Sequence, residues 1–372
     1  MRVIAKVFGA VVLLTAALLV AVAVFETTHA EPVAWTPPPA PSMDSGPYAR
    51  NTLLAGAKTF GRSNLLQPES VALGPDGKLY TGMNTGEIVR IDPNALALAK
   101  DPQTTPFELL ANTGGRPLGM IFHPNGDLIV ADGVKGLVSV SAKGDIKVLS
   151  TESEGLKYGF ADDVAVSADG RYIWLSDATW KFPYPNFTAD VIEHVGNGRL
   201  IQYDMQTGEA KTLLKDLQFA NGVAVSKAGD FVLVNETAAY RITRYWLSGP
   251  KAGQSDVFAD NLPGFPDNIR TDADGNFWVA APTTRDGLVD TLADKPAVRK
   301  VLAKLLKHIE FPVKPYAMAL GFDANGKLIA NLQAPKADGY YYITQVTPVG
   351  GKLYFNSVHN NGMAVIDRTI IQ

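Results

Sequence analysis

The stretch that decides the fold is DVAVSADGRYIWLSD, residues 163–177. It reads as a short apolar strand, a turn that ends in Gly170, and a second apolar strand. Asp-Gly or Asn-Gly between two strand-like runs is a strong hairpin signal, because both turn residues tolerate positive φ. The stretch therefore predicts a tight β-hairpin.

The same phrase recurs along the chain. Its other copies are SVALGPDGKLYTGM from Ser70, GMIFHPNGDLIVAD from Gly119, GVAVSKAGDFVLVNE from Gly222, NIRTDADGNFWVAAP from Asn268 and TQVTPVGGKLYFNSV from Thr344. Further strand pairs follow several copies, which gives four strands per unit at a spacing of roughly 45 to 60 residues. The similar phrase MALGFDANGKLIANL, from Met318, is interpreted as the outer hairpin of the fifth unit. The sequence thus predicts an all-β, six-bladed β-propeller over residues 49–372.

One segment departs from the β pattern. Between Arg285 and Ile309, apolar residues recur at helical spacing with lysines between them. This predicts an amphipathic helix inserted into blade five. The helix is interpreted as a cap on the propeller face, with contact to a membrane surface as the alternative.

The N-terminus predicts export. An uncharged apolar run, Val7–Phe25, follows Arg2 and Lys6, and as a helix it would cover roughly 28 Å, close to the hydrocarbon thickness of a bilayer. The basic flank predicts that the propeller lies on the non-cytoplasmic side. Residues 1–30 are therefore a transmembrane anchor, with a signal peptide cleaved after Ala30 as the alternative. Residues 31–48 are proline-rich and predict an extended spacer.

Composition narrows the possible partners. The chain has no cysteine, so thiolate metal sites and a cysteine nucleophile are excluded. The formal net charge is -3, and no basic stripe predicts binding to nucleic acid.

The repeats also align equivalent positions in the six blades. Stepping back seven residues from the residue that opens each inner turn leads, in blade order, to Glu69, Leu118, Asp162, Asn221, Asp267 and Ile343. Four of these positions carry oxygen-bearing side chains, and inner strands of a propeller line one channel. Three carboxylates that converge there would repel one another, and a bound hard cation removes that repulsion. Oxygen donors without sulfur or imidazole match Ca²⁺.

Longer phrases resemble the strictosidine-synthase-like propellers, most closely the branch that contains adipocyte plasma-membrane-associated protein. The resemblance covers roughly residues 50–370 and is carried by ANGVAVSKAGDFVLVNETAAYRITRYWLSGPKAG from Ala220, NLPGFPDNIRTDADGNFWVA from Asn261, FADDVAVSADGRYIWLSDATWKF from Phe160 and GRPLGMIFHPNGDLIVAD from Gly115. Gluconolactonases and paraoxonases belong to the wider superfamily, which binds calcium in its channel through Glu, Asn, Asn and Asp. Carried over by position, these ligands fall on Glu69, Asp162, Asn221 and Asp267, with Asn268 as a fifth.

The resemblance implies calcium-assisted hydrolysis of an ester or lactone, with Asp267 as the base. His359 lies where paraoxonases also carry a histidine, and it is the second catalytic candidate. Thr344 stands where strictosidine synthases use a glutamate, which disfavours alkaloid condensation. Leu118 stands where paraoxonases carry a histidine. The absence of this glutamate and this histidine favours the alternative, a non-catalytic binding platform in which calcium is structural.

Overall fold

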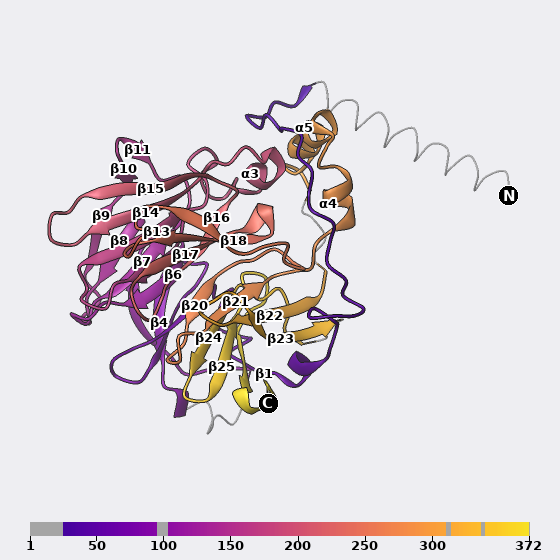
Figure 1. Cartoon of the computed structure of the whole chain (residues 1–372). Coiled ribbons are helices and arrows are strands. Elements are labelled where there is room, and N and C mark those ends of the chain that lie inside the picture. Colours follow the sequence, from indigo (N-terminus) through magenta and orange to yellow (C-terminus); the bar gives the residue numbers. More distant parts are fainter. Residues whose placement is uncertain (1–24, 95–102, 310–313, 336–338, 372) are drawn as a thin grey trace.

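Six four-stranded antiparallel sheets form a six-bladed β-propeller, as predicted (Figure 1). The computed structural model describes residues 25–94, 103–309, 314–335 and 339–371. Within these ranges no helix is long and apolar enough to cross a membrane. The predicted membrane segment, Val7–Phe25, lies outside them except for Phe25.

Each of blades one to five runs outward from the channel in chain order. Blade one contains β2 (Val71–Leu73), β3 (Leu79–Gly82), β4 (Glu87–Ile91) and β5 (Glu108–Asn112), and blade two contains β6 (Pro117–Phe122), β7 (Leu128–Asp132), β8 (Gly136–Val140) and β9 (Ile146–Ser150). Blade three contains β12 (Ala161–Val166), β13 (Tyr172–Asp177), β14 (Gly198–Asp204) and β15 (Ala210–Leu217), and blade four contains β16 (Ala220–Val225), β17 (Phe231–Glu236), β18 (Arg241–Trp246) and β19 (Ser255–Ala259). Blade five contains β20 (Ile269–Thr271), β21 (Phe277–Ala281), β22 (Tyr316–Phe322) and β23 (Leu328–Pro335).

Blade six closes the ring with strands from both ends of the chain. Its inner strands are β24 (Gln345–Val349), β25 (Lys352–Asn356) and β26 (Met363–Asp367), and its outermost strand is β1 (Lys58–Phe60). Thr59 is paired with Ala364 in an antiparallel register. The phrase from Met318 forms the outer hairpin of blade five, so the predicted blade count is confirmed.

The apolar core lies between neighbouring blades rather than inside one layer. Ile129 and Ala131 of blade two, for example, pack against Val164 and Leu175 of blade three. Five similar clusters join the other neighbouring pairs. Since a fully buried side chain of this kind contributes about 1.5–3 kcal/mol, the inter-blade seams hold the ring together.

A cap of short helices covers one side of the propeller (Figure 1). It consists of α3 (Thr188–Glu193) in blade three and of α4 (Gly287–Thr291) and α5 (Pro296–Leu305), both inserted between β21 and β22. The predicted amphipathic segment is thus helical, but it is two helices. The remaining short elements are η1 (Leu53–Gly56), β10 (Glu152–Ser153), β11 (Leu156–Lys157), η2 (Thr237–Ala239) and η3 (Arg368–Ile371).

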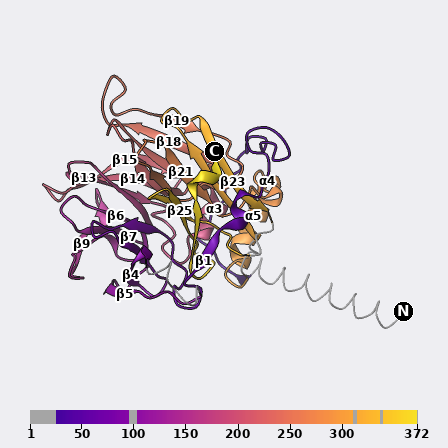
Figure 2. The same cartoon turned by 90° about the horizontal axis from the view of Figure 1, so that it is seen from below.

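Residues 31–42 of the proline-rich segment form no helix or strand, and they lie along the domain. Figures 1 and 2 both show this part of the chain (indigo) beside α4 and α5. Trp35 N–H donates to the carbonyl of Ala293 (3.2 Å), and Arg285 donates to the carbonyl of Pro38 (2.7 Å). Residues 26–41 are called the strap below.

Candidate functional site

The strand pairing defines which residues are equivalent at the channel. Val71, Met120, Val164, Val223, Ile269 and Val346 each pack against the preceding blade. The residue two positions earlier is then Glu69, Leu118, Asp162, Asn221, Asp267 or Thr344, in blade order. The prediction of Ile343 for blade six was wrong by one position, because only two residues, Gly350 and Gly351, join β24 to β25. These six residues are called the inner ring.

β-Bulges aim part of the inner ring at the channel. The pairing of β12 with β13 shifts between Ala161 and Val164, and that of β16 with β17 shifts between Ala220 and Val223. The bulges contain Asp162 and Asn221, and such irregularities re-aim side chains beside functional sites. A side chain on Gly222 would lie 2.5 Å from the Asp267 carbonyl oxygen, so the close approach of blades four and five requires glycine there.

The predicted ligands lie together and are buried. Glu69, Asp162, Asn221, Asp267 and Asn268 each expose less than a tenth of their surface. The Asn268 amide donates to Glu69 Oε1, and Asn221 donates to the carboxylate of Asp267. Three oxygens of this group, Glu69 Oε2, Asn221 Oδ1 and Asn268 Oδ1, have no hydrogen-bond partner among the described residues. Buried acceptors without partners are uncommon in proteins, and either a cation or a water molecule would satisfy these oxygens.

The carboxylates at the ring also repel one another. Burial and the Asp163 carboxylate raise the pKa of Glu69 to about 7. Burial, followed by the charge of Glu69, raises the pKa of both Asp162 and Asp267 well above the usual range. A nearby positive charge would oppose these upward pKa shifts, because it favours the ionised carboxylates.

The donor set fits a hard cation only when amide oxygens are included. Within the described ranges, no three His, Asp or Glu side chains are close enough together to hold a metal ion. Glu69, Asp162 and Asp267 would therefore need the amide oxygens of Asn221 and Asn268 to complete a coordination shell. Carboxylate and amide oxygens are the donors that Ca²⁺ takes. Binding of a metal by these five residues stays a prediction.

A second set of residues surrounds the mouth of the channel. It lies two positions before the inner ring in each blade and consists of Gln67, Arg116, Phe160, Phe219, Phe265 and Tyr342. Arg116 is 4% exposed, its Nη2 donates to the carbonyl of Gln67 (3.0 Å), and its Nη1 has no partner among the described residues. Burial lowers the pKa of Arg116, and the charge of Glu69 is the largest effect that opposes this shift. These residues are called the mouth ring.

The sequence prediction missed the mouth ring, although counting nine residues back from each inner turn finds five of its six members. Tyr342 adopts a left-handed conformation (φ 56°), which is unusual for a bulky side chain and concentrates at functional sites. Burial, together with the nearby Asp267 carboxylate, raises the pKa of Tyr342 to about 12. Tyr342, a member of the mouth ring, therefore lies close to Asp267, the predicted base.

His359 lies at the surface, beside Tyr342 of the mouth ring. Its side chain is exposed, and its ring lies 5.5 Å from that of Tyr341 and 5.9 Å from that of Tyr342. A catalytic role for His359 stays a prediction, and Tyr342 is the side chain between it and Asp267.

An ion pair crosses the channel. Arg270 of blade five donates to both carboxylate oxygens of Asp163 in blade three (2.7 and 2.8 Å), and both residues are buried. Because blades three and five are not neighbours, this bidentate pair spans the channel.

The two other inner-ring positions are closed by packing. Leu118 packs with Phe160, Ala178, Phe219 and Ala238 in an aromatic-rich cluster beside the mouth ring. The hydroxyl of Thr344 donates to the main-chain carbonyl of Glu69 (2.8 Å). Neither side chain is an acid or base, so any chemistry belongs to the other blades.

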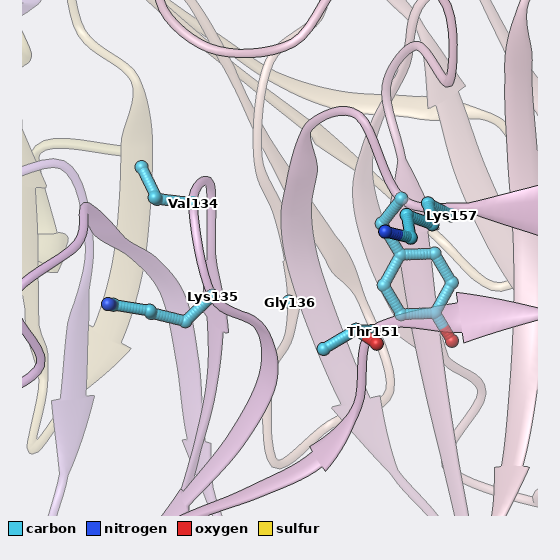
Figure 3. Close-up of a pocket in the computed structure, with 6 residues that line it drawn as sticks. Val134, Lys135, Gly136, Thr151 and Lys157 are labelled. Carbon is cyan, nitrogen blue, oxygen red and sulfur yellow. The ribbon is translucent and has the colours of Figure 1, made fainter.

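Two surface pockets lie away from the inner ring. One, of about 280 Å³, is lined by Lys135, Thr151, Lys157 and Tyr158 between blades two and three. Figure 3 shows that Lys157 reaches over this pocket, whereas the Lys135 side chain points away from it. The other, of about 350 Å³, lies against the turns that contain Pro75 and His123. The His123 ring contacts the carbonyl of Gly170 (2.7 Å), a contact that joins blades two and three.

Comparison with known proteins places these features in a family. The family model for strictosidine synthase matches residues 162–250, and that for the N-terminal part of strictosidine synthase-like proteins matches residues 46–91. Adipocyte plasma membrane-associated protein from Bos taurus is 35% identical over 340 residues, which cover 88% of this chain and 81% of the relative. Protein strictosidine synthase-like 6 from Arabidopsis thaliana is 33% identical over 324 residues, covering 86% and 84%.

Solved structures with low sequence identity share the fold. A gluconolactonase from Xanthomonas campestris superposes with a TM-score of 0.58 at 15% identity, over 92% of this chain and 99% of that one. The calcium-binding protein regucalcin from Agrobacterium tumefaciens gives a TM-score of 0.58 at 13% identity, over 84% and 93%. The length and level of identity to the curated relatives show that this chain belongs to the strictosidine-synthase-like family that includes adipocyte plasma membrane-associated protein.

Proposed function

We propose that this chain is a calcium-dependent hydrolase of esters or lactones. The observation that carries the proposal is the set of unpaired buried oxygens on Glu69, Asn221 and Asn268, beside the carboxylates of Asp162 and Asp267. The fold is also that of proteins described as a gluconolactonase and as calcium-binding regucalcin. The substrate is expected to be a small molecule.

The roles of the residues follow from their places. Glu69, Asp162, Asn221, Asp267 and Asn268 would hold the cation, which when bound supplies Lewis acidity toward a carbonyl oxygen. Asp267 would accept the proton of the attacking water. Arg116, with its unpaired Nη1, would attract the charge that develops on the carbonyl oxygen or a carboxylate of the substrate. Phe219 and Phe265 would contact its apolar part.

The test is hydrolysis of a panel of aryl esters and lactones by the full chain, with calcium and with a chelator. Calcium-dependent turnover is expected, and Asp267→Asn should reduce it by about 10²–10⁴-fold, the usual contribution of a general base. Glu69→Gln should weaken calcium binding measured by calorimetry. Turnover that is unchanged by the chelator would rule out this mechanism.

Asp169→Asn is the matched control. Asp169 is an exposed carboxylate. It lies in the turn after β12, the strand that contains Asp162. Its removal changes the charge by the same amount, and it should alter neither calcium binding nor turnover. A loss of activity in this variant equal to that of Asp267→Asn would show that the effect is not local to the ring.

A binding platform with structural calcium is the second candidate. The Arg270–Asp163 pair across the channel and the packed Leu118 favour it, because both fill space that a substrate would use. Tight calcium binding without turnover of any ester or lactone would favour this candidate, and the next search would be for a bound partner.

Membrane attachment is part of the proposal. Relatives carry the name plasma membrane-associated protein, and residues 7–25 of this chain form an apolar run. We infer a membrane anchor at the N-terminus with the propeller on the non-cytoplasmic side, or a secreted protein if the segment is cleaved. Fractionation of cells that express the chain with a C-terminal tag, followed by protease protection, distinguishes these outcomes.

A further inference from the structure

The strap completes the hydrophobic core of the cap. Ala30 is fully buried and packs in one cluster with Phe182, Ile192 and Ala303. Phe182 belongs to the loop before α3, Ile192 to α3 and Ala303 to α5. The strap is therefore a packed layer of the cap, and a larger side chain at Ala30 would not fit there.

One buried guanidinium joins the strap to both parts of the cap. Arg299, on α5, is 5% exposed. Its Nη1 donates to the carbonyls of Val33 in the strap (2.7 Å) and Ala293 (3.0 Å), and its Nη2 donates to the carbonyl of Ile192 in α3. The planar guanidinium has five N–H donors in a fixed fork and serves all three carbonyls at once, whereas methionine has no donor.

The strap also binds the C-terminal end of α3 directly. The N–H of Glu31 donates to the buried Glu193 carboxylate (2.7 Å), and the N–H of Val33 donates to the Glu193 carbonyl (3.1 Å). The indole of Trp35 stacks on the ring of His194 at 3.9 Å. Movement of α3 would break all of these contacts together.

The loop before α3 reaches the mouth ring. Phe187 stacks on Phe160 with centroids 4.9 Å apart and planes 10° apart, and Tyr184 stacks on Phe160 at 5.7 Å. Tyr184 is also close enough to Arg116 to affect its pKa. Residues 179–193 thus cover the mouth ring on the side of blades two to four, and they are called the lid.

We propose that the strap holds the lid closed over the mouth ring and thereby limits the size of the molecule that reaches the inner ring. The contacts run without a break from Val33 and Arg299, through α3, to Phe187 and Phe160. The statement about substrate size rests on the proposed hydrolase function. The statement that the strap positions the lid does not.

Hydrogen exchange of the full chain tests the positioning without any substrate. In Arg299→Met, the amides of residues 179–193 should exchange at least about tenfold faster, because local opening of the lid no longer breaks the guanidinium contacts. Ala30→Gln should give the same change from the strap side, by displacing the strap from the core. Faster exchange confined to the strap, with the lid unchanged, would overturn the proposal.

Arg244→Met is the matched control. Arg244 pairs with Asp256 on the outer part of blade four, away from the cap, and its loss should leave exchange of the lid unchanged. If Arg299→Met does not fold, hydrogen exchange of the lid in Ala30→Gln alone tests whether the strap positions the lid. Once turnover is measurable, both cap variants should lower KM for bulky esters relative to small ones. If the lid opens but KM changes equally for bulky and small esters, the proposed size limit is refuted, whereas the proposed hydrolase function is not.

Discussion

Asp163 and Arg270 show how single residues of a repeat acquire separate roles. Asp163 directly follows the ring residue Asp162, yet its carboxylate is bonded to the guanidinium of Arg270 and to the N–H of Val223 (2.9 Å). Asp162, by contrast, forms no ion pair with any residue that the structure describes. Two adjacent carboxylates thus differ in function because one of them has a partner across the channel.

We expect Arg270→Met to destabilise the protein by about 3–5 kcal/mol, because it leaves the Asp163 carboxylate buried without its cation. The free energy of unfolding in urea measures this change. Arg171→Met removes an ion pair with Asp204 in which the arginine is 48% exposed, and it should cost at most about 1 kcal/mol. Equal effects of the two substitutions would contradict the assignment of Arg270 as a buried channel pair.

At the scale of elements, α3 contains an unusual pair of buried acids. Asp190 and Glu193 are both buried, and both accept from the amide of Asn197 (2.7 and 2.8 Å). Glu193 also pairs with Lys181. Burial raises the pKa of Asp190 to about 7. The helix of the lid therefore carries a carboxyl group that takes up a proton near neutral pH.

The raised pKa of Asp190 makes the free energy of unfolding depend on pH. The folded state holds a proton on Asp190 between about pH 4 and 7, where the unfolded chain does not. The protonated Asp190 carboxyl therefore contributes to the free energy of unfolding at low pH, and this contribution is lost as the pH rises through 7. It amounts to about 4 kcal/mol at most. Asp190→Asn keeps an acceptor for Asn197 and removes the titration. The variant should therefore gain stability relative to the natural chain between pH 5 and pH 8.

Urea unfolding at both pH values checks this prediction. Asp169→Asn is the control, because the Ser167 hydroxyl lowers the pKa of Asp169, and this carboxyl is therefore ionised in both the folded and the unfolded chain at pH 5 and at pH 8. Its substitution should change the stability equally at the two pH values. If the Asp190→Asn difference does not change between pH 5 and pH 8, the carboxyl is not protonated in the folded protein.

At the scale of the whole molecule, the ring is closed by a strand from the other end of the chain. β1 supplies the outer strand of blade six, so Lys58–Phe60 and Met363–Asp367 are hydrogen-bonded neighbours. Without β1, the edge of β26 would be unpaired and the seam between blades six and one would lose Phe60. The ring is therefore closed by three residues that lie outside the repeats.

We expect a truncated chain that starts at residue 62 to lose its cooperative thermal transition, since it lacks β1. A chain that starts at residue 50 keeps β1 and should retain the transition, although the strap is absent. Circular dichroism during heating compares the two. A cooperative transition at the same temperature in both chains would show that β1 is not needed for closure.

The sequence by itself determined the six blades, the outer hairpin of blade five and four positions of the inner ring. These follow from turn chemistry and strand periodicity, which are local and repeat along the chain. Glu69, Asp162, Asn221 and Asp267 share a register because each lies at the same distance from its turn. Where a turn is shorter, as at Gly350 and Gly351, the same count gave Ile343 and the structure gives Thr344.

Only the tertiary structure decided what depends on contacts between distant segments. The Arg270–Asp163 pair joins residues 107 positions apart, and Arg299 donates to the carbonyl of Val33 in the strap, 266 positions earlier in the chain. No local pattern encodes such contacts, because they form only after the blades have closed around one axis. The unpaired oxygens of Glu69 and Asn221, the exposure of His359 and the docking of the strap all depend on that closure, which is why the sequence predicted the ring but not what surrounds it.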